Sequence, residues 1–255
     1  SSSAASDVYK RQDVDSGGIY IGFYDFGYDM NGSARVTMED VSIRGNTINA
    51  SGVGIYLDYE YVGYGLYDNA SVVMGDVSIE GTTINASSLG IYFYDRFWGD
   101  NHDYSAAIIG DVTITNNRFY DLLFGAFYIY YDDIGYDYFY NYSTLEVGDL
   151  VIANSTIDGA SYGIAVDYRY VYSDYNSTVT MGILNITGNN ISNVTSDGIY
   201  LGYYPYAYDN STISIGRGLI EGNTIDGCGA NGSYRYMEIY SDPGAEVNLE
   251  DPEIV

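Results

Sequence analysis

The stretch VSIRGNTINASGVGIYLD (41–58) joins an alternating apolar segment, an asparagine turn and a Gly-Ile-Tyr segment, and variants of it recur along the chain. The Gly-Ile-Tyr part, altered in some copies, begins at Gly18, Gly54, Gly90, Gly125, Gly163 and Gly198. The spacings between these glycines are 36, 36, 35, 38 and 35 residues. Self-similarity at such a period is the sequence signature of a stacked repeat architecture, so we expect one structural unit per copy.

A second motif lies between these copies, and its apolar positions alternate with polar ones. It occupies 36–48, 72–84, 107–119, 145–157, 179–191 and 213–225. Alternation of this kind indicates half-buried strands, and no window has a sustained helical period. Glycine, asparagine, serine and aspartate stand at the breaks, where turns are expected. Each unit is therefore predicted to consist of three or four short strands joined by turns.

A unit made only of short strands and turns cannot bury its own apolar face, but a stack of such units can. The sequence therefore predicts an all-β solenoid of about six coils. A β-propeller is the alternative, but it has a longer period, and the strand motif lacks a repeated Asn-Gly or Asp-Gly hairpin signal. One turn position forms an asparagine column instead, in which stacked side chains are expected to bond to their equivalents. Its members are Asn46, Asn117, Asn189 and Asn223, with Thr82 and Ser155 in the gaps.

The quoted stretch resembles the repeat of parallel β-helix proteins of the pectate-lyase-like and periplasmic copper-protein-like families. The shared pattern is apolar-x-apolar-x-x-Asn-x-Ile, then a short spacer, then Gly-Ile-Tyr. The resemblance covers all six repeats and implies a right-handed parallel β-helix (β-solenoid), here a tyrosine-rich variant with an additional aromatic segment in each repeat. Because that fold hosts lyases, hydrolases, adhesins and structural proteins, the resemblance implies no single function.

The composition excludes several classes of partner. The 255-residue chain has 9 basic and 35 acidic residues and a formal net charge of −26. Basic residues are too few to neutralise nucleic-acid phosphates, so no nucleic-acid partner is expected, and the same argument applies to an anionic membrane surface. No apolar run is long enough to insert into a membrane. A hydrophobic content of 46% suffices for a core, and the single cysteine, Cys228, excludes an intrachain disulfide.

Residues 1–12, SSSAASDVYKRQ, are unlike the rest of the chain and contain its only lysine, Lys10. They resemble a translated sequencing-adaptor tail, and a disordered native tail is the alternative. We therefore expect a non-native or disordered segment over 1–12 and a single β-solenoid domain over 13–255.

The two ends of the chain resemble parts of one coil. AEVNLEDPEIV (245–255) aligns with ARVTMEDVSIR (34–44), and DVDSGGIY (13–20) resembles INASGVGIY (48–56). Either the chain is a segment of a longer repeat array, or copies stack head to tail and complete a coil across each junction. Head-to-tail contacts that do not close generate filaments, so the chain itself is a predicted partner.

Asparagine is followed unusually often by the N-glycosylation pattern Asn-x-Ser/Thr. Twelve of the 19 asparagines stand in it, whereas chance would give about three. The pattern is the acceptor for N-glycans in exported proteins, so we expect an extracellular or cell-surface glycoprotein with covalent N-glycans. The predicted sites are Asn31, Asn49, Asn69, Asn85, Asn141, Asn154, Asn176, Asn185, Asn190, Asn193, Asn210 and Asn231.

Tyrosine is the dominant aromatic residue, with 33 copies against 8 phenylalanines and 1 tryptophan. In a solenoid, equivalent residues of successive coils lie about 4.8 Å apart, so rings at one position should stack. The predicted ladder is Tyr20, Tyr56, Tyr92, Phe127 and Tyr200, broken at Ala165. Its cover could be the rest of the same aromatic segment, a neighbouring filament or a glycan, and a sugar-binding site is the functional interpretation.

Catalysis on a polysaccharide by this fold would require paired carboxylates, or Ca²⁺ with a basic residue as proton acceptor. A column of aspartates, Asp40, Asp76, Asp111 and Asp149, is the weak candidate for Ca²⁺, and a solvated face is the alternative. His102 is the best local candidate for another site. The six repeats are alike, whereas a catalytic solenoid needs one deformed repeat, so no catalytic residue is assigned.

These observations together predict a structural protein rather than an enzyme. The expected function is that of a subunit of an extracellular, N-glycosylated filament or cell-surface layer, assembled head to tail by β-solenoid stacking. No cofactor is expected apart from Ca²⁺. The alternatives are a polysaccharide lyase or hydrolase and a carbohydrate-binding adhesin of the same fold.

Overall fold

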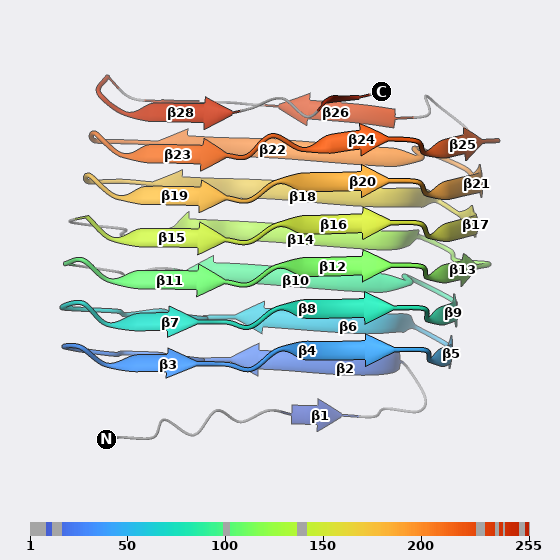
Figure 1. Cartoon of the computed structure of the whole chain (residues 1–255), viewed down its shortest axis with the longest axis horizontal. Coiled ribbons are helices and arrows are strands. Elements are labelled where there is room, and N and C mark those ends of the chain that lie inside the picture. Colours follow the sequence, from blue (N-terminus) through green and yellow to red (C-terminus); the bar gives the residue numbers. More distant parts are fainter. Residues whose placement is uncertain are drawn as a thin grey trace.

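The computed structural model describes residues 9–11, 17–98, 103–136, 142–227, 233–237, 240–241, 243–249 and 253–254. These residues form an all-β solenoid without a helix, so a transmembrane helix is also absent from them. Four sheets run along the solenoid, and each coil contributes one strand to each sheet (Figure 1). The predicted parallel β-solenoid of about six coils is confirmed.

The first sheet contains the longest strands. They are β1 (Tyr9–Arg11), β2 (Gly17–Tyr24), β6 (Val53–Glu60), β10 (Ile91–Trp98), β14 (Gly125–Tyr136), β18 (Tyr162–Ser173), β22 (Ile199–Ala207), β26 (Ser233–Met237) and β27 (Tyr240–Ser241). All pair in parallel except β1, which pairs antiparallel with β2. Part of the segment expected to be non-native or disordered therefore lies as a strand on the edge of the first coil.

The other three sheets are built from short strands. The second sheet contains β3 (Arg35–Thr37), β7 (Ser71–Val73), β11 (Ala106–Ile109), β15 (Thr144–Val147), β19 (Thr178–Met181), β23 (Thr212–Ile215) and β28 (Glu246–Leu249). The third contains β4 (Val41–Arg44), β8 (Val77–Glu80), β12 (Val112–Thr115), β16 (Leu150–Ala153), β20 (Leu184–Thr187), β24 (Leu219–Glu221) and β29 (Glu253–Ile254). The fourth contains β5 (Thr47–Ala50), β9 (Thr83–Ala86), β13 (Arg118–Tyr120), β17 (Thr156–Ala160), β21 (Asn190–Val194) and β25 (Thr224–Asp226).

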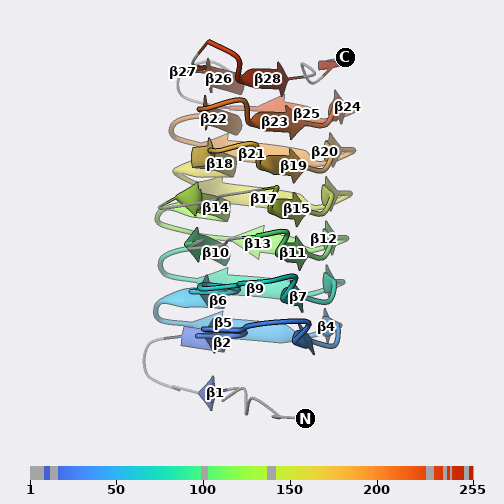
Figure 2. The ribbon, with the colours of Figure 1, turned by 90° about the vertical axis from the view of Figure 1, so that its left-hand side faces the viewer.

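The coils lie one above another (Figure 2). The core lies inside them and is formed by the inward residues of the four sheets. The apolar columns of the strand motif point into it: Ile79, Ile114, Ile152 and Ile186, for example, are fully buried or nearly so, one above the other. The strands inside the stack are buried on their inner side and paired on both edges, so stacking supplies the burial that a single coil cannot.

The turn between the third and fourth sheets uses one backbone conformation in every complete coil. Its first residue has a positive φ of 52–64°, a region that glycine and asparagine adopt with little steric cost. The residues at this position are Gly45, Gly81, Asn116, Asn154, Gly188 and Gly222. The glycine or asparagine before each member of the asparagine column is therefore a requirement of the turn.

Candidate functional site

The long strands of the first sheet carry aromatic side chains on both faces, and the inner ones belong to the core. Register aligns Tyr59 with Phe23 on one side, and the same inward column continues through Tyr131, Tyr168 and Tyr203. The rings of Tyr131 and Tyr168 stack at 5.0 Å and those of Tyr168 and Tyr203 at 5.2 Å. Tyr59, Tyr131 and Tyr203 are almost completely buried. These tyrosines fill the interior as aliphatic residues do in the other sheets.

The outer face of the same sheet carries a second aromatic column. Tyr20, Tyr56 and Tyr92 are aligned by register, and their ring centroids are 5.1 and 4.8 Å apart. Tyr128 continues the column at 5.6 Å from Tyr92, and Tyr200 lies in it farther along. The predicted outer ladder is therefore present, but its fourth member is Tyr128 and not Phe127.

Phe127 was predicted in this ladder, and that prediction is wrong. Register places Phe127 beside Ile91 on the inner face, where it is fully buried. The fourth copy is one residue out of step, because Ala126 rather than Gly125 stands opposite Gly90. Since side chains alternate between the faces of a strand, a shift of one residue moves the ring from the surface to the core.

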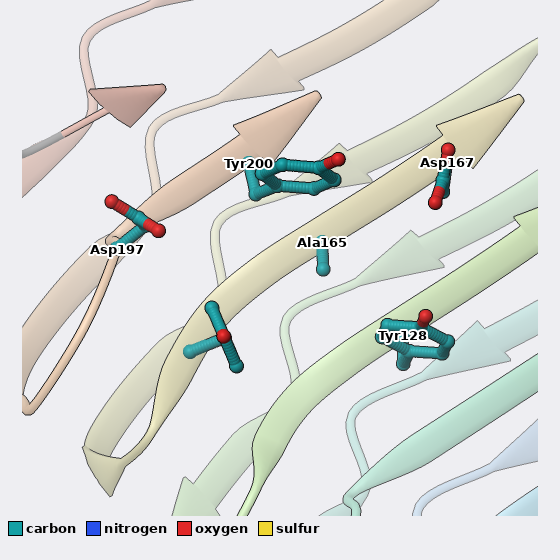
Figure 3. Close-up of a pocket in the computed structure, with 6 residues that line it drawn as sticks. Tyr128, Ala165, Asp167, Asp197 and Tyr200 are labelled. Atoms are coloured by element: carbon teal, nitrogen blue, oxygen red, sulfur yellow. The ribbon is translucent and has the colours of Figure 1, made fainter. Parts of the chain in front are cut away.

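The outer ladder is interrupted at Ala165, as the sequence predicted, and a pocket opens there (Figure 3). The pocket has a volume of about 480 Å³ and is lined by Tyr128, Tyr162, Ala165, Asp167, Asp197 and Tyr200. In Figure 3 Ala165 lies between Tyr128 and Tyr200, and Asp167 and Asp197 lie on either side of Tyr200. The pocket is therefore a gap between two rings with carboxylates beside it.

Asp167 is the most constrained charged group of this pocket. Its side chain is only 8% exposed, and its Oδ1 atom has no hydrogen-bond partner among the described residues. Burial raises the pKa of Asp167 to about 6, although the nearby Arg169 guanidinium opposes the shift. A buried carboxylate oxygen without a partner is costly, so this atom is a candidate ligand-binding group.

Asp58 occupies the same outer column as Asp167; its Oδ2 atom has partners, whereas its Oδ1 atom, like that of Asp167, has none among the described residues. The hydroxyl group of Tyr20 donates a hydrogen bond to Asp58 Oδ2 at 3.0 Å, and the Tyr24 hydroxyl donates to the same oxygen. Gly22 makes this possible, because a Cβ atom there would lie 2.7 Å from the Tyr24 ring and 2.9 Å from the Tyr20 hydroxyl oxygen. In the first two coils, Tyr20 and Tyr24 thus satisfy the Oδ2 oxygen of Asp58.

Asp95 is a carboxylic acid inside the core. Register aligns it with Tyr59 and Tyr131 in the inner column, and it is 0% exposed. Neither of its carboxylate oxygens, nor the Tyr59 hydroxyl, has a hydrogen-bond partner in the described part of the chain. Burial alone raises the pKa of Asp95 from 3.8 to about 8, so the neutral acid predominates at pH 7.

The predicted asparagine ladder is confirmed from Thr82 to Asn223. Asn189 shows its pattern: its Oδ1 atom accepts a bond from the backbone N–H of Ser155 at 2.9 Å, and its side-chain amide donates to the Ile152 carbonyl at 2.9 Å. The same amide also donates to Asn223 Oδ1 at 2.9 Å. Most bonds of the ladder therefore run between a side chain and the backbone of the neighbouring coil. Asn46 donates instead to Arg44 in its own turn.

The aspartate column also forms a ladder rather than a purely solvated face. The carboxylate of each member, Asp40, Asp76, Asp111 and Asp149, accepts a hydrogen bond of 2.8–3.0 Å from a backbone N–H of the next coil. No group of three or more carboxylate, thiol or imidazole side chains within the described ranges is arranged to hold a metal ion. The weak Ca²⁺ candidates thus have a structural role in cross-linking coils.

Ten of the predicted glycosylation sites fall on described residues. Asn185 is half-buried, and its side-chain oxygen accepts a bond from the Leu219 N–H at 3.2 Å. The other nine are exposed: Asn31, Asn49, Asn69, Asn85, Asn154, Asn176, Asn190, Asn193 and Asn210. Asn141, Asn231, His102 and Cys228 lie outside the described residues.

Comparison with known protein families, curated proteins and solved structures finds no match for this chain. The resemblance to pectate-lyase-like and periplasmic copper-protein-like repeats is therefore supported for the fold and not for membership of either family. Function has to be argued from the residues themselves.

Two features of the structure were not predicted from the sequence: the buried Asp95 and the pocket at Ala165. Asp95 follows Tyr59 by 36 residues, so an alignment by period places a carboxylate in an inward column. The break at Ala165 was visible, but the pocket also needs Asp167 and Asp197, which come from different coils. Both residues line this pocket only because their coils stack, and such stacking has no signal in a single segment.

Proposed function

We propose that this chain is a non-catalytic structural rod of an extracellular, N-glycosylated filament or cell-surface layer. The observation that carries the proposal is the uniformity of the coils. The three sheets of short strands keep one register throughout the described residues. Repetition of this kind builds length and stiffness, whereas an active site requires an exception to the repeat.

Continuation of the stack would use the hydrogen bonds that already join the coils. β28 pairs with β23 and β29 pairs with β24, in the register that relates β7 to β3 and β8 to β4. Among the described strands, β3, β4 and β5 at one end of the stack and β25, β28 and β29 at the other have a neighbour on one side only, and such edges are templates for further strands. In a filament each of these edges is covered by a further coil, either of the same chain or of another copy.

The surface supports an exported, glycosylated location. Nine described asparagines of the Asn-x-Ser/Thr pattern are exposed, so a glycan could be attached without unfolding a coil. The net charge of −26 favours solubility and repels lateral aggregation of exposed sheet edges.

Electron microscopy of native material released without denaturant tests this function. We expect long unbranched fibres with a coil spacing of about 4.8 Å and a repeat of about 29 Å for six coils. Peptide mass spectrometry of the same material should find glycans on exposed asparagines such as Asn85 and not on Asn185. Dispersed short rods, or unmodified asparagines throughout, would refute the filament and the glycoprotein parts respectively.

A further inference from the structure

The interruption of the outer tyrosine ladder leaves a space whose height is set by the spacing of the coils. Neighbouring rings of the ladder lie 4.8–5.6 Å apart, and Ala165 has no ring to place between Tyr128 and Tyr200. Two coil steps separate these two tyrosines, which corresponds to about 10 Å. One ring of another molecule can therefore occupy the level that tyrosine occupies elsewhere in the ladder (Figure 3).

The polar groups around this space are acidic. Asp167 and Asp197 line the pocket, and its lining contains no basic residue. Asp167 Oδ1 is the buried oxygen without a partner, whereas Asp197 Oδ2 accepts a weak bond from the Ser196 hydroxyl at 3.3 Å. Gly202 makes room for the Asp167 carboxylate, because a Cβ atom there would lie 2.5 Å from Oδ1 and 3.2 Å from the Tyr200 hydroxyl oxygen.

The nearest cation of the protein has another partner. Arg169 follows Asp167 on the same outer face, and its Nη1 atom donates a hydrogen bond to the Tyr130 hydroxyl at 2.9 Å. Its guanidinium also lies over the Tyr170 ring at 5.2 Å from the centroid. The carboxylate of Asp167 is therefore available to a cation from outside.

We propose that the gap at Ala165 binds an organic cation with a ring-sized apolar body. The ring inserts between Tyr128 and Tyr200, and the ammonium group lies against Asp167, while Asp197 lies at the opposite end of the pocket. The faces of tyrosine rings attract cations, and the Asp167 carboxylate adds a charge-assisted hydrogen bond. The chain's net charge of −26 raises the local concentration of cations and disfavours anions. This inference does not depend on the filament function.

Isothermal titration of the full chain with three probes of the same shape tests the proposal: benzylamine, benzyl alcohol and benzoate. We expect benzylamine to bind at least about tenfold more tightly than benzyl alcohol, and benzoate not to bind. Equal affinity for benzylamine and benzyl alcohol, tighter binding of a neutral methyl glycoside, or absence of benzylamine binding would each overturn it.

Two substitutions locate the site. Ala165→Tyr should restore the ladder and abolish benzylamine binding without loss of the folded β signal in circular dichroism. Asp167→Asn should retain the gap and reduce the preference for benzylamine over benzyl alcohol to less than about threefold. Unchanged benzylamine affinity in both variants would place binding elsewhere on the protein and refute the assignment.

A matched control distinguishes the effect of the carboxylates on binding from the effect of the gap. In the Ala165→Tyr background, Tyr92→Ala should open an equivalent gap between Tyr56 and Tyr128, where Tyr94 and Asp58 flank the removed ring in place of Asp167 and Asp197. Tyr94 stands here at the position that Asp167 has beside Ala165, and Asp58 Oδ2 already accepts bonds from Tyr20 and Tyr24, so this gap should show at least about fivefold weaker benzylamine binding than the natural one. Equal binding in both gaps would show that Asp167 and Asp197 do not select the cation.

Discussion

Asp95→Asn replaces the buried acid with a neutral side chain of the same shape, and it should change how stability depends on pH. Burial raises the pKa of Asp95 from 3.8 to about 8 in the folded chain, whereas the unfolded chain keeps the ordinary value. The folded state therefore binds more protons than the unfolded state between these two values. Stability consequently falls as pH rises from about 4 to about 8, and it is level above that range.

The size of the effect follows from the shift. Each unit of pKa difference corresponds to about 1.4 kcal/mol, so a shift of about four units corresponds to roughly 6 kcal/mol for the fully ionised state. Integration of the linkage relation between pH 5 and pH 9 gives a loss of about 4 kcal/mol for the native chain. The Asp95→Asn variant should lack this component, because an amide does not titrate.

Urea unfolding monitored by circular dichroism at a series of pH values measures the difference between the two chains. Hydrogen exchange of the β10 amides gives a local measure, which is needed because repeat proteins can open in part. Glu146→Gln is the matched control, since Glu146 is exposed and its loss removes one charge from the surface. Parallel pH curves for the native and Asp95→Asn chains would refute the burial argument.

Five further substitutions, two of them controls, test the ladders and the gap. Asn189→Ala should cost about 1–3 kcal/mol in urea unfolding, because it leaves the buried Ser155 N–H without its acceptor and removes one donor from the Ile152 carbonyl. Asn46→Ala, which loses one bond within its own turn, should cost less than about 1 kcal/mol, and equal losses would contradict the ladder. Gly148→Ala should destabilise by about 2 kcal/mol or more, because its Cβ atom would lie 2.5 Å from Asp111 Oδ1 and 2.7 Å from the Asp111 nitrogen. Gly125→Ala, with its nearest atom at 3.5 Å and no positive φ, is the tolerated counterpart, and a similar melting temperature for both would count against the packing argument. Ala165→Tyr should raise the melting temperature by a few degrees through new ring contacts, and a decrease would indicate that the gap is too small for a ring.

Several features followed from the sequence because they are local or strictly periodic. The period of about 36 residues, the alternation within the strand motif and the turn residues each depend on neighbours in the chain. The asparagine ladder followed from the same logic, since equivalent turns of a stacked repeat must lie above one another. The sequence by itself therefore determined the solenoid, its coils and the ladder at one turn.

The tertiary structure decided which face each aromatic residue occupies and what lies beside it. A one-residue offset moved Phe127 into the core and brought Tyr128 into the outer ladder, because successive side chains point to opposite faces. The buried place of Asp95, and the pocket that Asp167 and Asp197 both line, depend on contacts between coils that are distant in the chain. Composition and period determine that coils stack, but only the register of stacking determines which carboxyl group is desolvated and which rings lie beside it.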